Sequence, residues 1–329
     1  TDHAANIVAR YSWGVGSVTL FASCAILAFG APSQGVSAAL MLVTVALVGL
    51  PHGAYDLEVA RRLFAHRAGW SWWIWFGGAY LALTALAAGL WLIAPWVGLV
   101  ALLIGGAVHW GADDLEASTP SRVEGLWLAT SRGAIPVAAP MLFQPENVAT
   151  IFASLVGAES VPSAGVRTAG AIWMLLALPG LIACIMKFRR DPGTTPSVVA
   201  RSVLEPVVLL AWFSVAPPIL AFALYFCFWH SVRHSLRSAL AARPGAGVHT
   251  ALLAYLRAVA LPTALTWALA LAVWVLWRAD PLDAATTWQL VFIGLFALTV
   301  PHVLLELCEH RAERMDVRTV DGAERAQEG

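Results

Sequence analysis

The stretch TWQLVFIGLFALTVPHVLLELCEH, residues 287–310, decides the class of fold. It is a nearly continuous apolar run, and about 20 apolar residues in a helix are enough to cross the hydrocarbon core of a bilayer. The run also contains His302. An ionisable side chain at that depth is costly and by default indicates a function. The stretch therefore predicts a membrane helix that carries a functional group inside the bilayer.

The composition of the whole chain supports the same class. The chain is 59% hydrophobic and only 12% charged, whereas soluble domains carry about 25% charged residues. Its formal charge of +0 gives no concentrated basic face, so we expect no nucleic-acid partner. The four cysteines form no CxxC pair, which argues against a thiolate metal site. The single lysine, Lys187, ends an apolar run, so a mid-membrane Schiff base is not expected.

Runs of similar length recur along the chain, separated by glycine, proline or charged residues. They are 13–30, 36–60, 70–93, 96–116, 124–143, 168–188, 202–216, 218–241, 250–278 and 287–310. Ten crossings with both termini inside place every arginine cluster on the cytoplasmic side, where basic residues accumulate. Apolar residues at helical spacing in 145–158 predict an interfacial helix on the outer face. The expected fold is all-α, a polytopic membrane helical bundle of about ten transmembrane helices plus one interfacial helix.

Five histidines lie inside the apolar runs: His52, His109, His230, His234 and His302. In the ten-crossing topology all four helices that carry them run from outside to inside. Each histidine follows the start of its helix by roughly 13 to 17 residues, which is about 20 to 25 Å from the outer edge. We therefore expect one layer of histidines in the cytoplasmic half of the membrane.

Each of these helices carries a second ligand-capable group four residues after a histidine, on the same helical face. The pairs are His52 with Asp56, His109 with Asp113, His230 with His234, and His302 with Glu306. Imidazole binds Fe, Zn, Cu or Ni, and carboxylates complete the ligand shell or orient ligating histidines. The pattern predicts a metal site, and a proton-transfer chain is the alternative use of these groups. Pro51 and Pro301, each directly before a histidine, predict a kink or a widening of the site.

Four segments around these histidines resemble the histidine motifs of the Brp/Blh family of membrane β-carotene 15,15'-dioxygenases. They are GLPHGAYDLE (49–58), HWGADD (109–114), FWHSVRH (228–234) and TVPHVLLE (299–306), in family order. One departure is Trp110, where the family usually has phenylalanine. The resemblance implies a non-haem iron(II) enzyme that cleaves the central double bond of β-carotene with O2 into two molecules of all-trans-retinal. By the same resemblance, His52, His109, His230 and His234 are the metal ligands.

The resemblance leaves open whether His302 binds iron directly, shapes the pocket or serves a second metal. Asp56, Asp113 and Glu306 are candidates either for additional metal ligands or to orient the imidazoles from outside the metal's ligand shell. Candidates for the wall of a substrate tunnel are the aromatic residues near the histidines, namely Tyr55, Trp110, Phe226 and Trp229. Two arginines, Arg132 and Arg233, are expected to extend to the cytoplasmic interface, and for Arg132 the alternative is a pair with Asp113 or Asp114.

Two other functions are compatible with buried histidine and aspartate. One is a different membrane iron oxygenase, a hydroxylase or desaturase, although the chain has one HxxxH and no HxxHH cluster. The other is a metal or proton transporter, although the chain shows no repeated halves.

We expect residues 1–310 to form a single integral membrane catalytic domain and residues 311–329 a polar cytoplasmic tail. The expected location is the inner (cell) membrane of a bacterium or archaeon, with both termini cytoplasmic. The expected partners are β-carotene, O2 and the lipid bilayer, and a retinal-binding opsin is a candidate companion.

Overall fold

A computed structural model describes the backbone of residues 2–114, 122–190, 196–277 and 284–328. The structure is 91% helical, and those ranges contain no strand, which confirms the all-α prediction. The helices are α1 (Asp2–Phe29), α2 (Gln34–Thr44), η1 (Val45–Gly49), α3 (Leu50–Gly53), α4 (Asp56–Ala68), η2 (Gly69–Ser71), α5 (Trp72–Ile93), α6 (Pro95–Asp114), α7 (Arg122–Gly133), α8 (Ile135–Phe143), α9 (Pro145–Val156), α10 (Ser163–Arg190), α11 (Pro196–Val215), α12 (Pro218–Leu224), η3 (Tyr225–Ser231), α13 (Val232–Ala241), α14 (Val248–Leu276) and α15 (Ala284–Glu328). Of these, η1 and η3 are π-helices and η2 is a 3₁₀ turn.

Seven helices within the described ranges are long and apolar enough to cross a membrane, so the chain is a membrane protein. They are Ala4–Phe29, Gln34–Ala65, Gly69–Ile93, Pro95–Asp113, Ser163–Lys187, Val248–Leu276 and Thr286–Glu309. The other three predicted crossings, 124–143, 202–216 and 218–241, are helical but do not meet this criterion. The first is broken between α7 and α8, and the last is divided among α12, η3 and α13. The predicted count of ten crossings is therefore not confirmed.

Local sequence explains where several of these helices begin and end. Pro95, Pro145 and Pro218 each stand at the start of a helix, where the missing amide proton has no intrahelical partner to lose. Gly157 follows α9 with a φ of 69°, a left-handed conformation that glycine adopts without a steric penalty.

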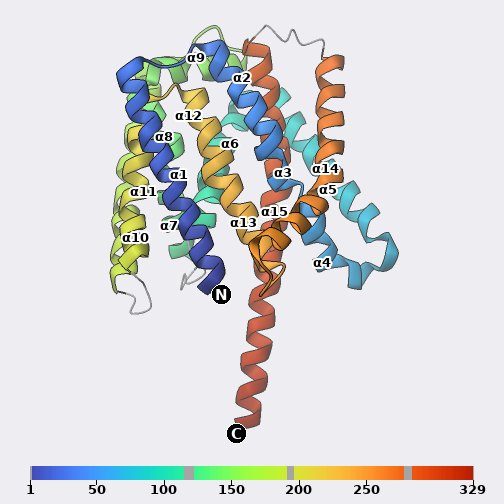
Figure 1. The fold of residues 1–329 in the computed structure, drawn as a ribbon. Coiled ribbons are helices and arrows are strands. Elements are labelled where there is room, and N and C mark those ends of the chain that lie inside the picture. The colour runs from blue at the N-terminus through green and yellow to red at the C-terminus, as the bar shows by residue number, and fades with distance from the viewer. Residues whose placement is uncertain (1, 115–121, 191–195, 278–283, 329) are drawn as a thin grey trace.

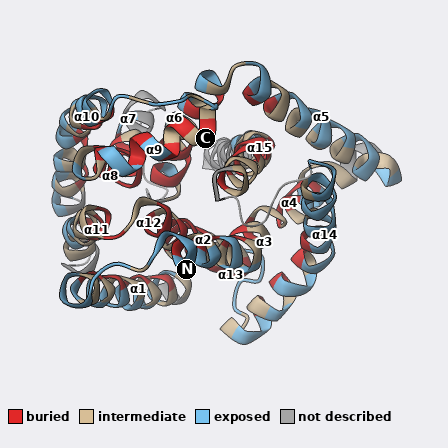
Figure 2. Cartoon of the chain, turned by 90° about the horizontal axis from the view of Figure 1, so that it is seen from above, coloured by how far each residue is buried: buried red, intermediate tan, exposed pale blue. Residues whose placement is uncertain are grey.

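The helices stand roughly side by side in a bundle, with α9 at one end and both chain termini at the other (Figure 1). Seen from above, α15 lies in the interior, while α1, α10, α11, α5 and α14 lie at the periphery (Figure 2). The predicted helix in 145–158 is observed as α9, and it buries an apolar face that includes Val148, Ile151 and Leu155. The backbone of the predicted tail continues α15 to Glu328, and the side chains of 313–329 lie outside the described part of the structure.

Two glycines allow α6 and α7 to pack with their backbones in contact. A Cβ atom at Gly111 would lie 1.7 Å from the carbonyl oxygen of Ala129, and one at Gly133 would lie 1.8 Å from that of Ala107. Any larger side chain would separate the helices. This crossing fixes the position of His109, which lies on α6 two residues before Gly111.

Candidate metal centre

Five histidines from five elements converge in the interior of the bundle. His52 comes from α3, His109 from α6, His230 from η3, His234 from α13 and His302 from α15. The ring centre of His52 lies 5.2 Å from that of His230 and 5.3 Å from that of His302, and the His109 and His230 rings are 4.7 Å apart. His234 lies 5.8 Å from both His52 and His302. The structure therefore brings together all five histidines that the sequence placed in one layer.

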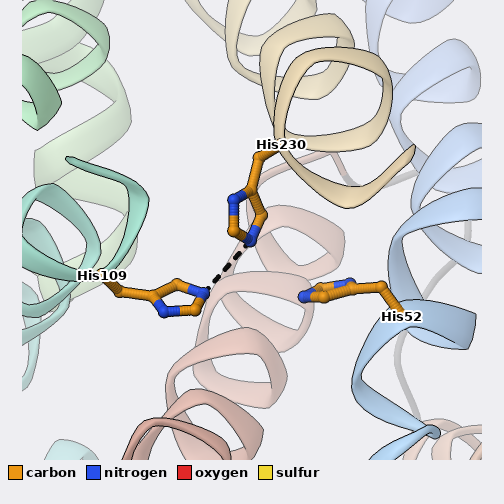
Figure 3. Close-up of side chains that lie close together, drawn as sticks. All are labelled: His52, His109 and His230. Carbon is orange, nitrogen blue, oxygen red and sulfur yellow. Dashed lines mark hydrogen bonds between the residues drawn. The ribbon is translucent and has the colours of Figure 1, made fainter. Parts of the chain in front are cut away.

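Three of the imidazoles point toward one another from different helices (Figure 3). His52, His109 and His230 are buried, and their nearest ligand atoms all lie within 4.8 Å of one another. A second group that meets the same limit contains His109, His302 and Glu306. The two groups share His109, so they form one continuous cluster of nitrogen and oxygen donors.

A π-helical turn, η1, precedes His52 and carries it toward this cluster. Pro51 has no amide proton, so it cannot complete a regular hydrogen-bond ladder. The carbonyl of Ala46 accepts a hydrogen bond from the indole of Trp267 instead, at 3.0 Å. The carbonyl of Gly49 accepts from Nδ1 of His52, which leaves Nε2 facing the cluster. Directly before Pro51 and His52, where the sequence predicted a kink or a widening of the site, the structure has a π-helix, a feature that is frequent at functional sites.

His230 lies within the longer π-helix η3, whose carbonyl groups are bonded by side chains. Ser231 Oγ donates to Phe226 O at 2.7 Å, Tyr11 Oη donates to Phe228 O at 2.7 Å, and Arg233 Nε donates to Trp229 O at 2.6 Å. These contacts compensate for hydrogen bonds that a regular α-helix would make internally. They hold the turn that directs His230 and then His234 into the cluster.

Carboxylates hold the outer nitrogen atoms of the imidazoles. His109 Nδ1 lies 2.9 Å from Glu306 Oε2, and His302 Nδ1 lies 2.8 Å from Asp56 Oδ1. Asp113 lies near two rings, 3.6 Å from His230 Nδ1 and 3.4 Å from His234 Nδ1. Carboxylates in this position fix the tautomer of a metal-ligating histidine.

All three predicted carboxylates are therefore at the site, but their main partners lie on other helices. Asp56 contacts His302 and not His52, Asp113 contacts His230 and His234, and Glu306 makes its shortest contact with His109. The spacing i and i+4 identified residues on one face without identifying which pairs meet. The i, i+4 pair His302 and Glu306 does make a contact, with 3.5 Å between His302 Nε2 and Glu306 Oε1.

The donor atoms fit a bound metal ion. Nε2 of His109 lies 3.1 Å from Nε2 of His230, and two nitrogen ligands about 2.1 Å from one ion at a right angle would be about 3.0 Å apart. These two Nε2 atoms are within hydrogen-bond distance of each other (Figure 3), and the 2.9 Å contact of His109 Nδ1 with Glu306 favours a lone pair on His109 Nε2, which can bind a cation. His302 Nε2 is also buried without a hydrogen-bond partner. Imidazole-rich sites of this kind suit Fe, Zn, Cu or Ni.

A cavity of about 300 Å³ adjoins the cluster and is lined mainly by apolar side chains. His52, His109 and His302 contribute to its wall, together with Trp110 and Phe226. These two aromatic residues were predicted to line a tunnel, and the structure places them beside the cavity.

The other two predicted tunnel residues lie away from this cavity. Tyr55 stacks on Tyr255 at 4.8 Å, and Trp229 donates a hydrogen bond from its indole to Thr19 Oγ1 on α1 at 3.0 Å. Neither residue belongs to the cavity wall that the described residues form. Their aromatic rings pack the bundle around the site instead.

Three polar residues near the site were not identified from the sequence, and one of them, Arg237, lies 3.0 Å from Asp113 Oδ1 through its Nη1 atom. Tyr80 on α5 donates to Asp56 Oδ2 at 2.8 Å and lines the cavity. Glu205 on α11 is buried, and its depth in an apolar run was the signal that could have identified it. For Tyr80 we find no comparable signal in the sequence.

Glu205 changes the interpretation of both arginines. Arg233 Nη1 lies 3.3 Å from each Glu205 carboxylate oxygen, and Arg132 Nη2 lies 3.4 Å from Oε2. Arg233 is 3% exposed, so the prediction that it extends to the membrane interface was wrong. Burial of a guanidinium requires a carboxylate partner, and Glu205 provides one.

Comparisons with known proteins agree with this geometry. A family model described as "Beta-carotene 15,15'-dioxygenase" matches residues 43–308, a range that includes all five histidines. No solved structure matches the chain.

Curated relatives cover most of the chain. The "Probable beta-carotene 15,15'-dioxygenase Blh" of Halobacterium salinarum is 28% identical over 92% of this chain and 93% of the relative. The "Beta-carotene 15,15'-dioxygenase" of the uncultured marine bacterium 66A03 is 26% identical over 80% of this chain and 90% of the relative. A "Probable beta-carotene 15,15'-dioxygenase Brp" of Halobacterium salinarum is 31% identical over 64% of this chain and 60% of the relative.

Proposed function

The chain belongs to the β-carotene 15,15'-dioxygenase family, and from this membership we propose that it cleaves the central double bond of β-carotene with O2. It is a carotenoid-cleaving dioxygenase. In the proposed reaction the central carbon–carbon double bond breaks and two carbon–oxygen double bonds form. Each half of the substrate takes one oxygen atom of O2, which gives two molecules of all-trans-retinal.

The observation that carries the proposal is the cluster of buried histidines beside an apolar cavity. We propose Fe(2+) as the resident metal, held by His52, His109, His230 and His234. Neutral imidazoles leave iron(II) its positive charge, and a bound iron with an open position supplies the redox chemistry that O2 requires. His302, with a buried and unbonded Nε2, is a candidate for a further ligand.

The carboxylates have a positioning role in this proposal. Glu306 holds His109, Asp56 holds His302 and Asp113 holds His234, each at Nδ1 of the ring, and Asp113 also lies 3.6 Å from His230 Nδ1. Each contact favours the tautomer with Nε2 free, which is the form that can bind a metal. Tyr80 in turn orients Asp56 through its hydroxyl group.

The cavity suits a hydrocarbon substrate. β-Carotene has no polar group, so it partitions into the bilayer and gains nothing from polar contacts in a pocket. An apolar wall with Trp110 and Phe226 beside the histidines can hold the polyene and exclude water from the reacting bond. This match between substrate and wall favours an apolar substrate over the ions of a transporter, and the family favours a carotenoid over the acyl chains of a hydroxylase or desaturase.

We also propose the orientation of the chain in a bacterial or archaeal cell membrane. Figure 1 shows the carboxyl end of α10 at the same end of the bundle as both termini, and its last turn carries Lys187, Arg189 and Arg190. Basic residues accumulate on the cytoplasmic side, so we assign this end to the cytoplasm. A product retinal released into the bilayer would be available to a retinal-binding opsin in the same membrane.

Expression in cells that accumulate β-carotene tests the function. We expect the orange colour to fade and retinal to appear in a chromatogram of extracted pigments. Alanine at any one of His52, His109, His230 or His234 should abolish both effects. Persistent colour with folded, iron-loaded wild-type protein would refute the function, and full activity of the four variants would refute the assigned ligands.

A further inference from the structure

The wall of the cavity is buried at one end and exposed at the other. Trp110, Phe226 and Leu295 line the cavity and are each less than 9% exposed. Leu81 and Leu265 line it too, but are 59% and 61% exposed. The cavity therefore runs from the interior of the bundle to the surface of the molecule.

The buried wall follows the helices that carry the histidines. Phe226 precedes His230 by one turn, and Leu295 precedes His302 by two turns. The histidines themselves, including His52, His109 and His302, line the same cavity. A molecule that occupies this cavity from the surface therefore lies against His52 and His109, two of the proposed metal ligands.

The exposed wall lies between α5 and α14. Leu81 belongs to α5 and Leu265 to α14, and both lie inside helices that can span a membrane. Figure 2 shows these two helices at the edge of the bundle, and Figure 1 shows that α4, which overlaps the space between them in the view from above, lies toward the end of the bundle that holds the chain termini. Exposed leucines at this depth face lipid, so the opening leads into the bilayer and not into water.

Polar groups at this opening are already bonded. Thr266 Oγ1 donates to the carbonyl of Pro262 at 2.9 Å, and Tyr80 Oη donates to Asp56 at 2.8 Å. The opening consequently presents little that would favour a polar ligand and has a low barrier for an apolar one.

Gly77 on α5 leaves room at this opening. It lines the cavity, and a Cβ atom built on it would meet no other atom within 4 Å. The neighbouring Gly78 is equally free of close contacts but is exposed and does not belong to the cavity wall. The absence of a side chain at Gly77 therefore keeps open the space through which a ligand would pass.

We propose that the gap between α5 and α14, bordered by Gly77, Leu81 and Leu265, is a lateral portal through which a long polyene enters the site directly from the bilayer. This inference rests on the proposed function, because that function supplies an apolar substrate dissolved in lipid.

The test uses the full chain in lipid nanodiscs of phosphatidylcholine loaded with β-carotene. We compare Gly77→Leu with its matched control Gly78→Leu, and measure the initial rate of retinal formation against the carotene content of the disc. A parallel measurement follows quenching of tryptophan fluorescence by β-carotene in chelator-treated protein, which reports entry without catalysis. Iron content and thermal unfolding of both variants are measured alongside.

We expect Gly77→Leu to lower kcat/KM by about tenfold or more, because the added side chain fills space through which the substrate passes. A mismatch of one methylene between a substrate and an apolar pocket already changes kcat/KM by about 10 to 200-fold. It should lower carotene quenching in the chelator-treated protein as well. Gly78→Leu should match the wild type in both measurements. Equal rates and equal quenching in the two variants would overturn the portal.

The experiment still tests the portal if the proposed function fails or if Gly77→Leu does not fold. If wild-type protein binds carotene but releases no retinal, the proposed function fails, while the quenching comparison still decides the portal. If Gly77→Leu does not fold, Leu81→Trp replaces it, with the exposed Leu86 on the same helix as the site of the control substitution. Full entry and activity in Leu81→Trp would likewise overturn the portal.

Discussion

Gly111→Ala is expected to disturb the metal centre through the packing of two helices, without changing any candidate ligand. The added Cβ atom would lie 1.7 Å from the carbonyl oxygen of Ala129 and 2.9 Å from the amide nitrogen of Gly133. To bring the first contact to 3.0 Å, α6 and α7 must separate by about 1.3 Å, because hard-sphere repulsion prevents a closer approach. His109 lies on α6 within one turn of the substitution and would move with the helix.

The expected magnitude follows from this displacement. Overpacking of this kind costs about 1–3 kcal/mol, and occasionally more. Metal sites tolerate ligand distances within about 0.2 Å of their usual values, so a shift of about 1 Å in His109 should reduce iron binding by at least an order of magnitude. We therefore expect a lower free energy of unfolding together with loss of iron and of carotene cleavage.

The assay measures thermal unfolding in detergent, iron per chain by elemental analysis, and retinal formation. Gly105→Ala on the same helix is the matched control, since a Cβ atom there would meet no other atom within 4 Å. It should preserve iron content and raise helix stability by up to about 1 kcal/mol. Wild-type stability and iron content in Gly111→Ala would show that α6 and α7 do not pack as closely as this reasoning requires.

Three other perturbations test the site. Tyr80→Phe removes the 2.8 Å hydrogen bond to Asp56, so we expect the free energy of unfolding to fall by about 1.5–3 kcal/mol. Retinal formation should also slow, because His302 loses its orientation. An unchanged free energy of unfolding in mixed micelles would contradict this expectation. Glu205→Gln removes the carboxylate that neutralises buried Arg233. This change should lower the free energy of unfolding by about 3–5 kcal/mol and so reduce the yield of folded protein. A normal yield would argue against the ion pair. Chelation should abolish cleavage and lower the melting temperature, because a metal at 100 times its Kd stabilises by about 2.7 kcal/mol; added iron(II) should restore both, and full activity without metal would refute the metal centre.

The sequence by itself determined the class of fold and the set of histidines and carboxylates that lie at one depth in the membrane. Apolar length predicts a membrane helix because every backbone polar group in lipid must be bonded within its own segment. The histidines could be selected for a related reason, since an ionisable side chain such as His302 is costly inside a bilayer and by default indicates a function. The structure accordingly brings together all five histidines and all three carboxylates that the sequence singled out.

Only the tertiary structure decided which of these groups meet. Periodicity relates a residue to its neighbours on the same helix, but the rotation and crossing of packed helices set the contacts between helices. Asp56 therefore bonds His302 and not His52, although the spacing of the sequence pairs it with the latter. The buried pair of Glu205 and Arg233 depends in the same way on how α11 and α13 pack. The bounds of the π-helices, which direct His52 and His230 inward, also depend on bonds from side chains far away in the sequence, such as Trp267 and Tyr11.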